Sequence, residues 1–128
     1  MNTRARIATI CQSGNFHPTV MENNAEILNR LTLALKQNPD LVCLPESFSS
    51  GSVPRETVAN LVETIPGPTT DLVAKAAREN RCYILCPVFT KREGRYWNTV
   101  VVIDRTGNII GFYDKSSPTL PTNNTGRA

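Results

Sequence analysis

The stretch from Asp40 to Phe48, DLVCLPESF, constrains the fold more than any other part of the chain. Its four consecutive apolar residues, 41–44, predict a strand that is covered on both faces. Pro45 ends this strand because proline has no N–H to donate to a β-ladder. Glu46 therefore stands directly after a core strand, and in open α/β sheets the carboxyl ends of strands are where sites form. Glu46 is a candidate site residue, with a solvated loop glutamate as the alternative.

The residues around this stretch predict an α/β fold. Residues 5–11 read as a first strand, and Thr19 and Glu22 form a capping box that opens a helix running to about residue 37. A short helix is expected from Pro54, and a further helix over residues 70–80. The face of this second helix that is predicted to be buried consists of Leu72, Val73, Ala76 and Ala77.

The second half of the chain predicts antiparallel strands. Apolar runs over residues 82–89, 96–104 and 109–113 are separated by short turns that contain Gly94 and Gly107. Turns this short join antiparallel neighbours, so we expect a β-meander built onto the same sheet.

Composition excludes several classes of protein. The 128 residues suffice for one domain with its own core. The net charge of +3 comes from scattered basic residues, which argues against nucleic-acid binding. We also expect no membrane association, because no apolar run approaches the length of a membrane span. The N-terminus does not resemble a signal peptide, so the expected location is the cytoplasm.

The four cysteines do not form a metal-binding pattern. None belongs to a Cys-x-x-Cys pair and the single histidine, His17, is distant in sequence, so no metal site is expected. Each cysteine lies in or beside an apolar run, which is typical of small buried residues in a reducing compartment. Cys43 or Cys86 acting as a nucleophile is a further possibility, although a reactive thiol needs an exposed, electropositive setting.

Lys115 is the second candidate site residue. It ends the last predicted strand, as Glu46 follows the central one. If both strand ends open on the same side, a carboxylate and an ammonium converge, and each favours the charged form of the other. The alternative is a surface lysine at a strand end.

Three motifs resemble the nitrilase (carbon–nitrogen hydrolase) superfamily. They are Leu44-Pro45-Glu46, then Asn98-Thr99 in a strand, then GNIIGFYDK over residues 107–115. With the order of predicted elements, the resemblance extends from about residue 5 to 119. It implies an α-β-β-α sandwich that is incomplete here, with one mixed parallel and antiparallel sheet carrying helices on one face. Residues 1–128 would form the N-terminal part of a carbon–nitrogen hydrolase domain.

The resemblance also implies a chemistry. Members hydrolyse small amides, nitriles or carbamoyl compounds through a Glu–Lys–Cys triad and a thioester, with neither a metal nor an organic cofactor. It places the glutamate at Glu46 and the lysine at Lys115. Phe48, Ser50 and Gly51 are expected to line the mouth of the substrate pocket.

The chain departs from the family pattern after Lys115. In the family, the nucleophilic cysteine follows the lysine, but no cysteine follows Cys86 in this chain, so the nucleophile is absent. Residues 116–128 read as a truncated active-site loop or a disordered tail. We therefore expect a chain that is inactive alone and whose exposed sheet is covered by a missing C-terminal half or in a homo-oligomer. The alternative is a non-catalytic interaction module that pairs through this exposed sheet.

Overall fold

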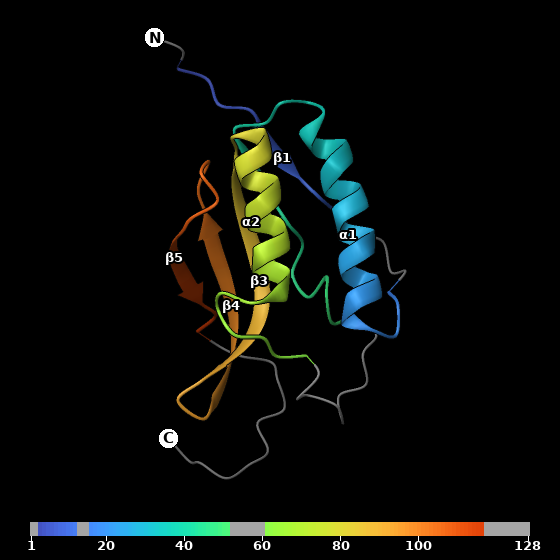
Figure 1. Cartoon of the computed structure of the whole chain (residues 1–128), viewed down its shortest axis with the longest axis vertical. Coiled ribbons are helices and arrows are strands. Elements are labelled where there is room, and N and C mark those ends of the chain that lie inside the picture. Colours follow the sequence, from blue (N-terminus) through green and yellow to red (C-terminus); the bar gives the residue numbers. More distant parts are fainter. Residues whose placement is uncertain (1–2, 13–15, 52–60, 117–128) are drawn as a thin grey trace.

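A computed structural model describes residues 3–12, 16–51 and 61–116 of the chain. Within them, one five-stranded sheet carries two helices (Figure 1). The elements in chain order are β1 (Ile7–Thr9), α1 (Val20–Leu35), β2 (Leu41–Cys43), α2 (Pro68–Asn80), β3 (Tyr83–Arg92), β4 (Arg95–Ile103) and β5 (Ile109–Asp114).

The sheet is mixed, with strand order β1-β2-β3-β4-β5. Strands β1, β2 and β3 are parallel, and Val42 of β2 lies between Ala8 and Ile84. Strands β3, β4 and β5 form an antiparallel meander. The predicted α/β class and the predicted meander are both confirmed.

Helix α1 begins at the predicted cap. The Thr19 hydroxyl accepts a hydrogen bond from the Glu22 backbone N–H at 3.2 Å. The carboxylate of Glu22 binds the Thr19 hydroxyl at 2.6 Å, whereas a capping box uses it to accept a backbone N–H. The structure therefore confirms the predicted cap by the Thr19 hydroxyl, whereas the Glu22 carboxylate contacts that hydroxyl instead of the Thr19 backbone N–H.

The main core lies between the helices and one face of the sheet. Helix α1 contributes Ile27, Leu31 and Leu35, and α2 contributes Val73 and Ala77. These residues pack on the inward-facing side chains of the strands, namely Val42, Ile84, Cys86, Val88, Val101 and Ile103. Leu72 was predicted to face inward with the α2 stripe, but it is 42% exposed because it lies beside that stripe rather than on it.

The opposite face of the sheet is apolar and open among the described residues. Side chains alternate between faces along a strand, so the neighbours of the core residues point away from the helices. They include Ile7, which is 59% exposed, Tyr113, which is 67% exposed, and the partly buried Leu41, Cys43, Leu85, Val100 and Val102. Both helices lie on the other face (Figure 1).

Two predictions lie outside the described residues. The helix expected from Pro54 falls mainly on residues 52–60, and the loop or tail expected over 116–128 falls almost wholly on residues 117–128. Neither described helix is long and apolar enough to cross a membrane.

Candidate active site

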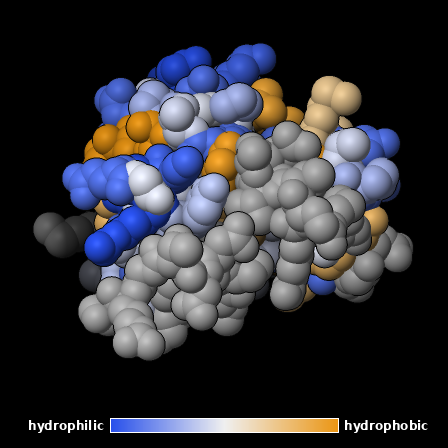
Figure 2. All heavy atoms as spheres, turned by 90° about the horizontal axis from the view of Figure 1, so that it is seen from below, coloured by the Kyte–Doolittle hydropathy of each residue, from blue (hydrophilic) through white to orange (hydrophobic). Residues whose placement is uncertain are grey.

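Glu46 lies just beyond the carboxyl end of β2. Strand β2 runs parallel to β3, and β3 runs toward the lower end of the molecule in Figure 1, which is the end viewed in Figure 2. The Leu44 N–H still bonds to the Leu85 carbonyl at 3.1 Å, so the chain follows β3 up to Pro45. Ser47 then has a φ of 59°, in the left-handed region that non-glycine residues seldom occupy. Phe48 next enters the core and is fully buried, while the Glu46 side chain remains 57% exposed. The sharp turn at Ser47 therefore separates an exposed carboxylate from a buried aromatic ring.

The carboxylate of Glu46 receives two side chains from the meander. Lys115 Nζ lies 2.9 Å from Glu46 Oε1, and Asn98 Nδ2 donates to the same oxygen at 2.7 Å. The backbone N–H of Lys115 also donates to the Asn98 carbonyl at 2.8 Å, which fixes the two residues side by side. The structure thus brings together the two residues singled out in the sequence.

The charges in this cluster reinforce one another. The hydrogen bond from Lys115 lowers the pKa of the Glu46 carboxyl, and the hydrogen bond from Asn98 lowers it further, against a small opposing effect of burial. Glu46 is therefore ionised at neutral pH, flanked by a cation and a carboxamide. An ionised carboxylate can accept a proton, and a fixed ammonium can stabilise a developing oxyanion.

Asn98 is a site residue to which sequence reasoning gave no role. It lies on β4 opposite Phe89 and is 7% exposed. Its position in the Asn-Thr motif was the available signal, but only the folded sheet, in which β3 lies between β2 and β4, shows that its carboxamide reaches Glu46.

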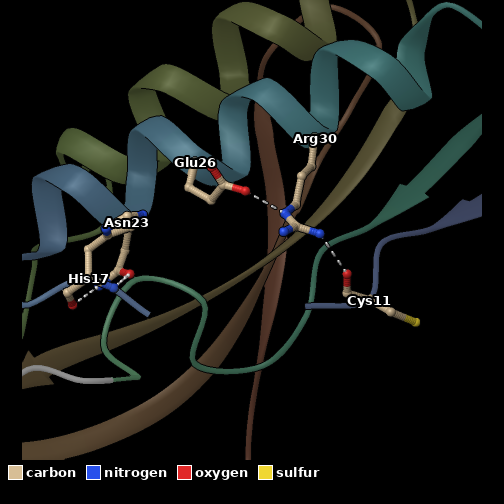
Figure 3. A network of polar contacts seen from close by, with 5 residues as sticks. All are labelled: Cys11, His17, Asn23, Glu26 and Arg30. Carbon is tan, nitrogen blue, oxygen red and sulfur yellow. Dashed lines mark hydrogen bonds and ion pairs between the residues drawn. The ribbon is translucent and has the colours of Figure 1, made fainter. Parts of the chain in front are cut away.

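Asn23 of α1 is a second residue that the sequence did not single out. It is fully buried, its Oδ1 accepts the His17 N–H at 2.8 Å, and its Nδ2 donates to the His17 carbonyl at 2.9 Å (Figure 3). The same Nδ2 donates to the Ser49 carbonyl at 3.2 Å. Asn23 therefore ties the turn that follows Glu46 to the start of the first helix.

The three residues predicted to line the pocket mouth have different settings. Phe48 is part of the helix-side core, and Ser50 is buried, with its N–H bonded to the Ser47 carbonyl at 3.1 Å. Gly51 is exposed, and a Cβ there would meet the Phe16 ring at 2.1 Å. The packing of Phe48 gives it a structural task, and contact of these residues with substrate stays a prediction.

The cysteines differ in accessibility. Cys82 and Cys86 are fully buried, and desolvation raises the pKa of both thiols. Cys43 is partly buried on the open face, and Cys11 is exposed. A buried thiol with a raised pKa is a poor nucleophile, so Cys86 is unsuited to that role. The described residues contain no group of three potential metal ligands.

Comparison with known proteins identifies the family of the chain. The carbon-nitrogen hydrolase family matches residues 6–127, nearly the whole chain, and the chain belongs to this family. A formamidase from Bacillus cereus (strain B4264) is 34% identical over 85 residues, which cover 64% of this chain and 26% of the formamidase.

Solved structures show the same fold. The carbon-nitrogen hydrolase from Helicobacter pylori G27 superposes with a TM-score of 0.73 and 21% identity, over 87% of this chain and 39% of that one. An amidase from Nesterenkonia sp. gives a TM-score of 0.70 and 20% identity, over 88% of this chain and 43% of that one. The chain thus spans less than half the length of each of these relatives.

Proposed function

We propose that this chain is the glutamate- and lysine-bearing part of an amidase-like enzyme that hydrolyses small amides. One observation carries the proposal: Lys115 and Asn98 converge on a single carboxylate oxygen of Glu46. In the family this chain resembles, a cysteine completes a Glu–Lys–Cys triad. We propose that this cysteine comes from outside the 128 residues, because in the family it follows the lysine in the chain and no cysteine follows Lys115 here. Cys82 and Cys86 are, in addition, buried on the helix side of the sheet.

Each residue has a defined part in the proposed reaction. Glu46 accepts the thiol proton, and the thiolate adds to the amide carbonyl carbon to give a tetrahedral oxyanion. The Lys115 ammonium stabilises that oxyanion. As the C–N bond breaks, the proton held by Glu46 passes to the leaving nitrogen, and a thioester remains. Glu46 then takes a proton from water, whose oxygen attacks the thioester carbonyl carbon. The C–S bond breaks, the sulfur recovers the proton from Glu46, and the carboxylic acid leaves.

A small amide is the substrate class best supported. The relative with 34% identity is a formamidase, and a structural neighbour is an amidase. Nitriles and carbamoyl compounds are the alternatives that the family resemblance leaves open.

Ammonia release from formamide, acetamide and butyramide tests the proposal. We expect no turnover by the 128-residue chain alone, and turnover by a longer chain that continues through a nucleophilic cysteine. In the longer chain, Glu46→Gln should reduce kcat by about 10²-fold or more, the usual size of a general-base effect. Glu79→Gln is the matched control, since Glu79 is an exposed helix residue paired only with Lys75 among the contacts seen here.

Two results would contradict the proposal. Turnover by the 128-residue chain that disappears in Glu46→Gln would show that no outside cysteine is needed. Turnover by the longer chain that survives Glu46→Gln would remove Glu46 from the mechanism.

The apolar open face supports a second candidate, a non-catalytic interaction module. Ile7 and Tyr113 are largely exposed on this face, and apolar patches of this kind mark interfaces. This candidate predicts a soluble oligomer of defined size in light scattering, with no amide hydrolysis in any form of the chain. A monomer that unfolds cooperatively would count against it.

A further inference from the structure

We infer that Arg92 is a positioning residue, which holds Lys115 against Glu46 by anchoring Asp114 on the opposite face of the sheet. This inference rests on the proposed function of Glu46 and Lys115. It concerns how the lysine is placed rather than which reaction it serves.

Two adjacent cross-strand pairs, which join the middle of β4 to the end of β5, point to opposite faces of the sheet. Thr99 pairs with Asp114, and Val88, which lies opposite Thr99 on β3, packs in the helix-side core. Thr99 and Asp114 therefore face the helix side. Because side chains alternate, Asn98 and Lys115 face the other side, where both contact Glu46.

Arg92 lies on the helix side of the sheet, beside Thr99 and Asp114. Its guanidinium forms an ion pair with the Asp114 carboxylate, which also accepts the Thr99 hydroxyl at 2.6 Å. The guanidinium carbon lies 4.5 Å from the centroid of the Phe112 ring and 5.3 Å from that of Trp97. Aromatic rings attract a cation at such distances, so three side chains hold Arg92, namely those of Asp114, Phe112 and Trp97.

This anchor acts at the residue before the site lysine. Lys115 follows the last residue of β5, where a strand end frays unless it is tied down. A lysine side chain is also long and flexible, so its position depends on the backbone that carries it. Because consecutive side chains point to opposite faces, holding Asp114 on the helix side of the sheet also orients the Lys115 side chain on the other side.

The test is the pKa of Glu46, measured by carboxyl-detected NMR titration of the 128-residue chain. Lys115→Gln gives the largest rise in the Glu46 pKa that loss of the lysine can cause, since it removes the main contact that lowers this pKa. Asp114→Ala is the decisive variant because a positioning role and a simple loss of negative charge predict opposite changes in the pKa of Glu46. Loss of positioning releases Lys115 and raises the pKa of Glu46, whereas mere removal of a nearby negative charge lowers it.

We expect Asp114→Ala to raise the proton affinity of Glu46 about threefold or more, in the direction of Lys115→Gln. Arg92→Gln should act in the same direction, and Arg92→Lys, which keeps the charge, should restore part of the effect. Asp40→Ala is the matched control, because Asp40 pairs with Arg105 in a separate ion pair at 3.5 Å. It should leave the pKa of Glu46 unchanged.

Each outcome decides the matter. A pKa of Glu46 that falls or stays constant in Asp114→Ala overturns the positioning role while leaving the proposed site intact. A pKa of Glu46 at its ordinary value in the unaltered chain shows that the Glu46–Lys115 contact is absent, and both proposals then fail. Variants that only lose thermal stability, with the Glu46 titration unchanged in the folded population, show a structural role for Arg92 and not a positioning one.

Discussion

Replacement of Asn23 by alanine tests whether the turn after Glu46 is held by the first helix. The carboxamide of Asn23 makes two hydrogen bonds with His17 (Figure 3). It makes a third with the Ser49 carbonyl, and Asn23 is fully buried. Asn23→Ala removes all three and leaves those backbone groups without their partner. The Ser49 carbonyl belongs to a buried residue, and a buried backbone group that loses its partner pays its full desolvation cost.

The size of the stability loss in Asn23→Ala can be estimated from these three hydrogen bonds. At about 0.5–1.5 kcal/mol net for each hydrogen bond, the three contribute about 1.5–4.5 kcal/mol. Alanine returns about 0.5 kcal/mol through its higher helix propensity. The difference is about 1–4 kcal/mol, and we expect Asn23→Ala to lower the free energy of unfolding by about 2–3 kcal/mol, the middle of this range and a large part of the stability of a small domain.

Urea denaturation, followed by circular dichroism and by fluorescence of the single tryptophan, measures this change. The urea midpoint should fall by about 1–2 M, with an unchanged slope. Asn29→Ala is the matched control, since Asn29 is an exposed residue of the same helix, and it should be neutral or stabilising by about 0.5 kcal/mol. Equal midpoints for the two variants would refute the reasoning.

Three further predictions concern other parts of the molecule. Gly107→Ala should destabilise the chain by at least about 1 kcal/mol more than Gly94→Ala in the same urea assay: both glycines have positive φ, but only at Gly107 would a Cβ meet a backbone oxygen, at 2.8 Å. Equal losses would argue against that close approach. Native alkylation followed by mass spectrometry should label the exposed Cys11 well before the buried Cys86, whose thiol pKa is raised by desolvation, and rapid labelling of Cys86 would contradict its burial. The pKa of Asp114 is lowered, mainly by its arginine partner, so its contribution to stability is present above its ordinary pKa of 3.8 and is lost as the pH falls through the lowered value. The unfolding free energy should therefore decrease less between about pH 5 and about pH 2 in Asp114→Asn than in the unaltered chain. An equal decrease in the two proteins would count against the ion pair.

The local elements were accessible from the sequence because their causes are local. The apolar run 41–44, the Thr19 cap and the short turns around Gly94 and Gly107 each depend on residues close together in the chain. The mixed sheet followed from the order of these elements. Leu72 is where this reasoning failed, since helical spacing alone does not fix how wide a stripe the sheet covers.

The sequence by itself determined that Glu46 and Lys115 would each stand at the end of a strand. Only the tertiary structure decided that they meet, because 69 residues separate them and 52 separate Glu46 from Asn98. Their contact depends on the register of β4 with β5 and on the left-handed turn at Ser47. Hydrophobic patterning specifies which face of a strand is buried, but register and backbone turns are set by the packing of the whole sheet. For that reason the residues of the site could be named from the sequence, and their geometry could not.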